Sequence, residues 1–397
     1  MENWKRSFRA ICAGEILAIA GFNASIPILP FYIEDLGVTD PTALNLWVGA
    51  CATVVAVALA VFAPVWGRLA DSYSKRTMLL RAMFGGTVVM ALMGVVAHPW
   101  QLLVLRGIQG ALTGTVAAAT VLVATISPPE KAGWSLGLLQ TAVYTGSSIG
   151  PAIGGVISDL FGHRANFFFT AGMLLTAAFV ILRFVPRDEP TAPHAGPFWR
   201  RLLPDFSALS RSRALVMLLV VSGAVQVATS VVSPILPLFI QSITPGPARV
   251  ASITGLILGL SALSAALAAA GIGRASHAVG YERTLTLCLA GSFLLAAPQA
   301  FVRTPLQLLV LRVLGGAFLG GSMPAVNALI AARSDRNRQG TVYGLSSSLN
   351  STGAAVGPMI GASVAVGLGY PSAFFVTAAI LLAATAASRV LIRKEQA

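Results

Sequence analysis

Long runs of apolar residues recur from one end of the chain to the other, separated by short polar segments. Each run has about 20 residues, which a helix needs to cross a hydrocarbon core of about 30 Å. The runs are continuously apolar, whereas the strands of a membrane barrel alternate apolar and polar residues, so helices are predicted. The predicted spans are residues 8–33, 45–69, 78–97, 100–126, 133–158, 165–185, 213–240, 249–272, 284–302, 305–332, 340–367 and 370–392.

One long polar segment interrupts this pattern. Residues 186–212 are rich in proline and arginine, and six predicted spans lie on either side of them. Proline and polar residues clustered between periodic segments indicate a loop or linker. The sequence therefore predicts an N-terminal six-helix bundle (residues 1–185), a cytoplasmic linker (186–212) and a C-terminal six-helix bundle (213–397).

The two halves repeat each other at an offset of 206 or 207 residues. The matching segments are Pro27–Pro30 with Pro234–Pro237, Gln101–Arg106 with Gln307–Arg312, Gly150-Pro151 with Gly357-Pro358, and Phe167-Phe168 with Phe374-Phe375. A direct repeat relates two bundles by an axis along the membrane normal, with a cavity between them. The prediction is an all-α membrane protein of twelve transmembrane helices in two bundles related by pseudo-two-fold symmetry.

Composition agrees with a membrane protein. Of the residues, 56% are hydrophobic and 10% are charged, whereas a soluble domain carries about 25% charged residues. Cys12, Cys51 and Cys288 lie in apolar runs without paired spacing, so neither a disulfide nor a metal site is predicted.

The formal net charge of +13 would also suit a nucleic-acid-binding protein, so the positions of the charges matter. If the amino terminus is cytoplasmic and the spans alternate, Lys and Arg residues lie on cytoplasmic segments with five exceptions. Arg164, Arg249 and Arg303 lie outside, and Arg106 and Arg312 lie within spans. This distribution follows the positive-inside rule. We predict a multi-pass protein of the bacterial inner membrane with both termini in the cytoplasm, and no nucleic-acid partner.

Signatures of other function classes are missing from the sequence. There is no Gly-x-x-x-x-Gly-Lys-Ser/Thr loop for ATP, and no His-Glu-x-x-His zinc motif among the four dispersed histidines. We therefore predict neither an ATP-driven pump nor an enzyme, and no cofactor or metal. Transport remains.

The segment from Gly67 to Arg76 resembles the cytoplasmic signature of the major facilitator superfamily, with Gly, an acidic Asp and a basic pair, although Ser74 stands where Gly is usual. The resemblance covers essentially the whole chain and implies the major facilitator fold. Asp71 could pair with a base or with the positive amino end of a helix and so latch one conformation. The basic residues could instead only fix topology. The implied gating residues are Gly67, Arg68, Asp71, Lys75 and Arg76.

Two charged residues inside spans are candidates for proton coupling. Arg106 lies in the fourth span, where an ionised side chain costs several kcal/mol unless a partner or water compensates it. Its surroundings resemble the superfamily's fourth-span motif, whose Arg is associated with proton coupling; the alternative is a structural Arg bound to backbone carbonyls. Glu15 is the one carboxylate well inside a span. It is the leading proton-site candidate, and the alternative is a hydrated residue near the cytoplasmic mouth.

The fifth span carries glycines at intervals of four residues together with a proline. Such a stripe permits close helix packing, and the proline adds a kink. The stripe resembles the antiporter motif that is enriched in exporters of the superfamily; the alternative is a generic packing surface. Its expected partner is the run of small residues 265–273. The motif residues are Gly146, Gly150, Pro151, Gly154 and Gly155.

Sparse polar and aromatic residues within the spans are predicted to line a substrate cavity, a mixture that suits varied hydrophobic compounds. Each could instead serve packing or an interhelical hydrogen bond. The nominated residues are Phe22, Asn23, Phe31, Gln109, Gln140, Tyr144, Gln226, Asn327 and Asn350.

Within the superfamily, the chain resembles the drug/proton antiporters and, among them, multidrug resistance proteins. The resemblance rests on Trp4-Lys5-Arg6, the paired Pro-Ile-Leu-Pro segments and the Gly-Pro stripe. It implies a monomeric secondary transporter in the lipid bilayer that exports small hydrophobic or amphipathic compounds in exchange for protons by alternating access, and so confers antibiotic resistance. The alternatives are a specific exporter or importer of a sugar or metabolite, and an uncoupled facilitator.

Overall fold

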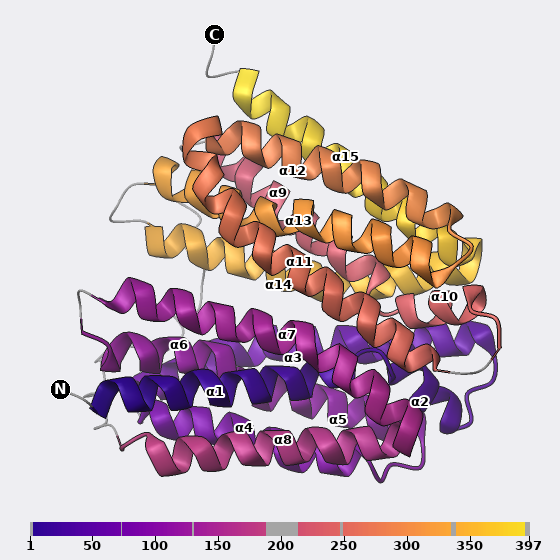
Figure 1. Ribbon diagram of the computed structural model, residues 1–397, viewed down its shortest axis with the longest axis horizontal. Helices are drawn as coiled ribbons and strands as arrows, with labels where there is room; N and C mark the ends of the chain where they lie inside the picture. Colours follow the sequence, from indigo (N-terminus) through magenta and orange to yellow (C-terminus); the bar gives the residue numbers. More distant parts are fainter. Residues whose placement is uncertain are drawn as a thin grey trace. The chain divides into compact units, whose positions relative to one another are not determined.

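The computed structural model describes residues 3–72, 74–128, 131–187, 213–246, 249–334 and 339–393, and most of these residues are helical (Figure 1). The helices of the first half are α1 (Asn3–Ala24), α2 (Leu29–Asp35), α3 (Pro41–Ser72), α4 (Lys75–Met93), α5 (Pro99–Leu112), α6 (Thr115–Ile126), α7 (Ala132–Phe161) and α8 (His163–Phe184). Those of the second half are α9 (Arg213–Val232), α10 (Leu236–Ile243), α11 (Val250–Val279), α12 (Tyr281–Ala296), the 3-10 helix η4 (Ala297–Phe301), α13 (Pro305–Arg333), α14 (Gln339–Leu368) and α15 (Tyr370–Arg393).

The helices follow the twelve predicted spans. In the described part of the chain, ten helical segments are long and apolar enough to cross a membrane, and the bent pair α1 and α2 makes an eleventh when it counts as one span. The thirty residues of α7 extend over about 45 Å and coincide with the predicted fifth span. The predicted spans therefore account for the helices, and the chain crosses the membrane many times.

The helix α3, which forms the second predicted span, is longer than the sequence indicates. The structure continues α3 to Ser72, three residues beyond the predicted span 45–69, so residues 70–72 are helical. No proline interrupts this stretch. The helix α4 begins directly after Ser74, whose side chain accepts a hydrogen bond from the Thr77 backbone N–H at 3.2 Å. Ser74 thus serves as an N-cap at the position where the superfamily signature usually has Gly.

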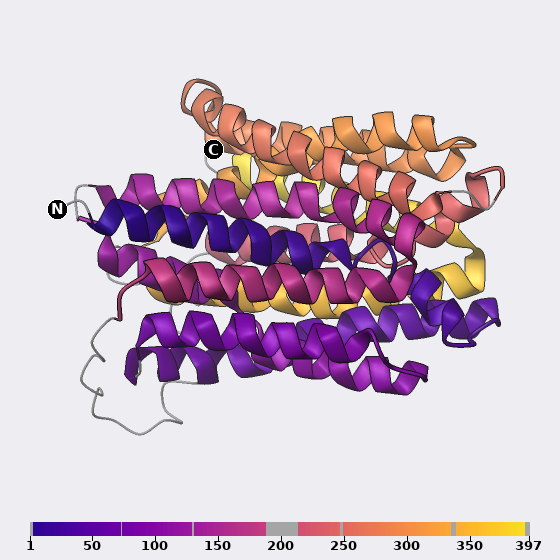
Figure 2. The same ribbon diagram turned by 60° about the horizontal axis from the view of Figure 1, so that its bottom comes forward.

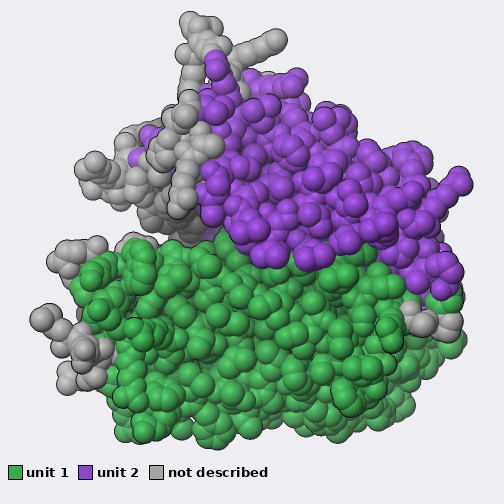
Figure 3. Space-filling view, in the orientation of Figure 1, with its two compact units in different colours: residues 1–40, 54–196, 246–259 green, residues 41–53, 197–245, 260–397 purple. Residues whose placement is uncertain are grey.

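The chain forms two compact units, shown in different colours in Figure 3. Unit 1 draws on residues 1–40, 54–196 and 246–259, and unit 2 on residues 41–53, 197–245 and 260–397. The first part of α3 therefore belongs to unit 2, and the first part of α11 belongs to unit 1. Most of the predicted linker lies outside the described residues, and the predicted boundaries of the two bundles stay predictions.

The first span is broken where the sequence places its Pro-Ile-Leu-Pro segment. Proline lacks the N–H that a continuing helix needs, and α1 and α2 meet at a bend of 49°. The carbonyls that the break exposes need partners inside the protein. Asn166 of α8 donates to the Ala24 carbonyl at 3.1 Å, and Thr170 donates to the Gly21 carbonyl at 3.1 Å. These bonds attach α8 to the end of α1, and both views show these helices side by side (Figures 1 and 2).

The glycine stripe of α7 packs against α1. A methyl group at Gly146 would lie 2.8 Å from the Ile16 carbonyl oxygen, and methyl groups at Gly150 and Gly154 would come closer still to Ala20 and Ala24. Only glycine lets the two backbones approach so closely, so this stripe determines where α7 lies in unit 1.

Unit 2 repeats this packing in the same register. Gly353 and Gly357 of α14 approach the backbone of α9 beside Val227, and Gly361 approaches Val231. Val227 and Val231 are the residues that a shift of 207 assigns to Ala20 and Ala24. The internal repeat therefore preserves the packing between helices as well as the sequence.

Aromatic contacts follow the same repeat. In unit 1 the rings of Tyr32 and Phe167 lie 4.8 Å apart, and in unit 2 those of Phe239 and Phe374 lie 4.9 Å apart. Each pair joins a short helix, α2 or α10, to the last helix of its half. The first phenylalanine of each repeated pair, Phe167 or Phe374, is thus explained by packing.

We predict that Gly154→Val destabilises the detergent-solubilised protein by at least about 1–3 kcal/mol, the usual cost of overpacking. Thermal unfolding followed by circular dichroism would measure this. The matched control is Gly172→Val on α8, where an added Cβ meets nothing within 4 Å. A Gly154→Val protein as stable as this control would contradict the close packing of α1 and α7.

Candidate functional site

Arg106 is held by neutral side chains inside unit 1. The residue is 7% exposed, and its guanidinium donates to the side-chain oxygens of Gln109 at 3.2 Å and Ser25 at 3.5 Å. Gln109 lies one turn further along α5, and Ser25 lies at the break after α1. Hydrogen bonds to neutral groups lower the cost of a charge within a span without removing it. The break in the first span thus supplies one of the partners of this arginine.

Glu15 lies in the middle of α1 and is fully buried in unit 1. Neither of its carboxyl oxygens has a hydrogen-bond partner among the described residues. The hydroxyl group of Thr115 is near enough to interact with the carboxylate, although not at hydrogen-bonding geometry. A buried carboxyl group without hydrogen bonds is costly and marks a candidate functional site.

The neighbour of Glu15 is the first residue of a half-helix. The fourth span is interrupted between α5 and α6, where Gly114 has φ of 119°, a conformation that favours glycine. The first N–H groups of a helix lack intrahelical partners, and that end carries partial positive charge. The arrangement places a buried acid beside the amino end of α6. A break of this kind at membrane depth is typical of ion and substrate sites in transporters.

The two proton-coupling candidates lie at different depths. Ser25, which binds Arg106, follows Glu15 by ten residues, which corresponds to about 15 Å along a helix. We therefore treat Glu15 and Arg106 as separate groups in the same unit.

Of the predicted gating residues, Arg76 has a defined structural role. It is 8% exposed and donates to the Leu182 carbonyl in the last turn of α8 at 2.7 Å. A cation at the carboxyl end of a helix is favourable, so Arg76 joins the start of α4 to the end of α8. Lys75 is the first residue of α4. The side chains of Arg68 and Asp71 and the contacts of Gly67 are outside the described part of the chain, so the latch stays a prediction.

The end of the antiporter stripe contacts α11 as well as α1. A methyl group at Gly155 would meet the Ala251 backbone, and one at Gly255 would meet the Pro151 carbonyl. Ser148 donates to the Gly259 carbonyl at 2.8 Å. This partner surface, at residues 251–259, differs from the expected run 265–273. Because the stripe occupies the later part of α7, it meets the beginning of α11 instead of its end.

A carboxylate strengthens this contact. Asp159 Oδ2 accepts a hydrogen bond from the Ser252 backbone N–H at 2.8 Å, at the start of α11. A negative charge at the amino end of a helix is favourable. Asp159 lies beyond the glycine stripe and was not nominated from the sequence. The sequence could have indicated Asp159 as a lone acidic residue near the outer end of a predicted span.

The nominated cavity residues of unit 1 make mainly local contacts. Phe22 packs against Gly86 of α4, Phe31 stacks on His163 with rings 6.0 Å apart, and Asn23 donates to the Ile19 carbonyl of its own helix at 2.8 Å. Gln109 binds Arg106. Gln140 and Tyr144 are exposed on α7.

The nominated cavity residues of unit 2 also make mainly local contacts. Gln226 donates to Ser230 at 3.3 Å on the same helix, and Asn350 accepts from Ser222 at 2.9 Å, a bond between α14 and α9. Asn327 is exposed. A common substrate cavity formed by all nine residues stays a prediction, because these contacts are the packing and hydrogen bonding that the alternative expects.

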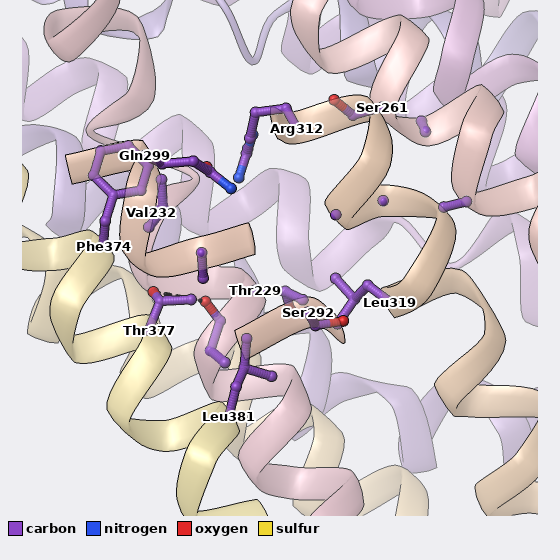
Figure 4. A pocket seen from close by; sticks show the side chains of 16 residues that line it. Thr229, Val232, Ser261, Ser292, Gln299, Arg312, Leu319, Phe374, Thr377 and Leu381 are labelled. Atoms are coloured by element: carbon purple, nitrogen blue, oxygen red, sulfur yellow. Dashed lines mark hydrogen bonds between the residues drawn. The ribbon is translucent and has the colours of Figure 1, made fainter. Parts of the chain in front are cut away.

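Unit 2 contains a cavity that the sequence did not reveal. It has a volume of about 240 Å³, and its walls come from α9, α11, α12, η4, α13 and α15 (Figure 4). Arg312 and Gln299 lie at one side of it, and Phe374 and Leu381 contribute apolar surface. None of the nominated cavity residues lines it. The repeat did single out Arg312 as the mate of Arg106, but gave no sign of space beside it.

The sequence matches the family model described as Major Facilitator Superfamily over residues 11–253 and 226–397. It is 37% identical over 395 residues to the multidrug resistance protein MdtG of Klebsiella pneumoniae, covering 100% of this chain and 95% of that protein. It is 36% identical to an MdtG of Escherichia coli, covering 96% and 93%.

Solved structures share the fold. A mutant of the nucleoside transporter NupG has a TM-score of 0.81 at 15% identity, covering 97% of this chain and 99% of that one. A bacterial homologue of the human lysosomal transporter Spinster, inward-facing and unoccupied, has a TM-score of 0.79 at 14% identity, covering 99% and 98%. The predicted fold of two related helical bundles is thereby confirmed.

We predict that Gln109→Leu, which removes an oxygen bound to Arg106, lowers the free energy of unfolding by about 1.5–3 kcal/mol, the range for hydrogen bonds to charged groups. The matched control is Gln140→Leu on the exposed face of α7, which we expect to stay within about 0.5 kcal/mol of wild type. Thermal unfolding in detergent compares the two. Equal stability of both variants would show that the bond to Gln109 contributes nothing.

Proposed function

Because the chain belongs to the major facilitator superfamily, we propose that it is a secondary active transporter that exports small hydrophobic or amphipathic compounds in exchange for protons. The names of the MdtG relatives support multidrug export, since they match nearly the full chain at 36–37% identity. The proposed location is the bacterial inner membrane, with both termini cytoplasmic and the protein acting as a monomer.

The observation that carries the proton coupling is the buried carboxyl group of Glu15. It has no hydrogen-bond partner among the described residues, and it lies beside the start of the half-helix α6. A group in this position gains most when a proton or a cationic compound arrives, because its oxygens lack hydrogen bonds and the amino end of α6 offers only partial positive charge. Proton and cationic substrate would therefore compete for one carboxylate. Such competition couples two opposite fluxes.

Arg106 would act as a fixed charge in this mechanism. Its hydrogen bonds to Gln109 and Ser25 hold the guanidinium at the break between α1 and α2. A change in the bend between these helices would move Ser25 relative to Arg106. We infer that Arg106 positions the first span, and that its charge influences ions entering the same bundle.

The packing of α7 supports alternating access. The end of its stripe contacts the start of α11, and in unit 2 residue Thr53 of α3 donates to the Ala355 carbonyl of α14 at 2.8 Å. Both contacts tie the first part of a long helix to a glycine-rich helix. Smooth surfaces without interlocking side chains can separate and close again at low cost. We infer that these contacts form and break during transport.

The test uses purified full-length protein in liposomes with an imposed proton gradient. Transport of a fluorescent hydrophobic cation and proton counterflow are recorded separately. We predict that wild type couples the two fluxes and that Glu15→Gln, which keeps the size but cannot ionise, loses the coupling. The matched control is Asp35→Asn, an acid on the same bent span that binds His163 at 2.6 Å and is half exposed. It should retain coupled export.

The outcomes separate the alternatives. Coupled fluxes in Glu15→Gln would remove Glu15 from the mechanism and leave multidrug export standing. Dye transport by wild type without proton counterflow would identify an uncoupled facilitator. Transport of neither dye nor protons across a chemically broad panel would overturn multidrug export, and specific sugars and metabolites would then be tested.

A further inference from the structure

The two repeated arginines have different surroundings. Arg106 binds Gln109 and Ser25. A shift of 206 residues assigns Gly315 to Gln109, and a shift of 207 assigns Val232 to Ser25. These two hydrogen-bond partners of the first arginine are therefore lost in the second half, and both replacements line the cavity beside Arg312. The second half thus keeps the arginine but lacks the two side chains that accept hydrogen bonds from it in the first half.

Arg312 remains without compensation in unit 2. Its Nε is buried with no hydrogen-bond partner among the described residues, and its guanidinium end points into the cavity toward Gln299 (Figure 4). Glu282 is the one carboxylate in the described part of unit 2, and it binds Arg333. It precedes Ser292, the first cavity residue on α12, by ten residues, about 15 Å of helix, and does not line the cavity.

The polar groups around Arg312 are already engaged as donors. Gln299 donates its amide to the Leu295 carbonyl at 2.9 Å, Ser292 donates to the Cys288 carbonyl at 2.8 Å, and Thr377 donates to the Ala228 carbonyl at 3.2 Å. Their oxygens can still accept hydrogen bonds. Arg312 is thus the positive group of the cavity, and the rest of the wall is neutral or apolar.

From these observations we propose that this cavity is a binding site for a monovalent anion, with Arg312 as its counterion. The fork of a guanidinium matches a carboxylate or a similar acid group with two oxygens. The apolar wall near Phe374 and Leu381 accepts a small hydrophobic body. The volume of about 240 Å³ is below the range of about 300–1,000 Å³ for pockets that hold drug-sized ligands, so a small acid fits best.

The test measures binding directly, by calorimetry on purified full-length protein in detergent and chloride-free sulfate buffer. The probe is benzoate, and benzyl alcohol is its neutral counterpart. We expect saturable binding of benzoate and at least tenfold weaker binding of benzyl alcohol, because a charge-assisted hydrogen bond contributes about this factor. The measurement needs neither a proton gradient nor export, so its result does not depend on the proposed function.

Three variants locate the site. Arg312→Gln removes the charge, and we expect at least a tenfold loss of benzoate affinity, with partial recovery in Arg312→Lys. Gly315→Leu keeps the charge and fills the cavity; a Cβ there has only ordinary contacts with Leu295 and Gln299, at 3.7 and 3.9 Å, so the variant should fold and lose benzoate binding. The matched control Arg303→Gln removes an exposed arginine of the same unit that does not line the cavity, and it should bind benzoate like wild type. Thermal unfolding checks that each variant is folded.

Two further measurements identify the source of the anion. Benzoate carried across liposomes by wild type and not by Arg312→Gln would make the acid a transported compound. Benzoate displaced by chloride and not carried would make the occupant a resident inorganic ion. A folded Arg312→Gln protein with wild-type benzoate affinity, or equal binding of benzoate and benzyl alcohol by wild type, would overturn the proposal.

Discussion

The structure depends on one constraint, that a polar group surrounded by hydrocarbon must find its partner within the protein. Regular helices meet this constraint for the backbone, and every interruption needs a side chain. The break after α1 exposes carbonyls that Asn166 and Thr170 satisfy. In unit 2, Thr377, the repeat mate of Thr170, donates to the Ala228 carbonyl. In both units, proline thus bends a span where a neighbouring helix carries a hydroxyl or amide group that reaches the exposed carbonyls.

The same constraint explains why the glycine stripes matter. Van der Waals contact replaces the hydrophobic effect as the force that packs helices in a bilayer, and it is strongest where backbones approach closely. Gly154 and Gly361 mark equivalent approaches of α7 to α1 and of α14 to α9. Asn166 of α8 and Thr377 of α15 bind the carbonyls of the same two helices, α1 and α9. Close packing at glycine and hydrogen bonding by polar side chains thus act on the same helix within each unit.

Much of the fold could be predicted from the sequence, because hydrophobic length and repeated motifs carry it. The spans, the repeat and the bent proline segments are of this kind. The predicted end of the second span was too early because nothing in residues 70–72 distinguishes a helix that leaves the membrane from a loop. The partner of the α7 stripe was wrong because a stripe shows that a helix packs closely without showing against what. The cavity beside Arg312 could not be seen, because it arises from glycine and valine, which give no chemical signal.

The charges show how a repeated fold can acquire unlike halves. Packing between helices involves many residues in register, so a substitution at one of the duplicated glycines or aromatic residues disturbs its neighbours. A polar partner of a single arginine can be lost alone once something else compensates the charge. Unit 1 contains a buried acid and an arginine held by Gln109 and Ser25, whereas unit 2 contains an arginine beside open space. The first arrangement suits the exchange of a proton, and the second suits an anion that enters from outside the protein.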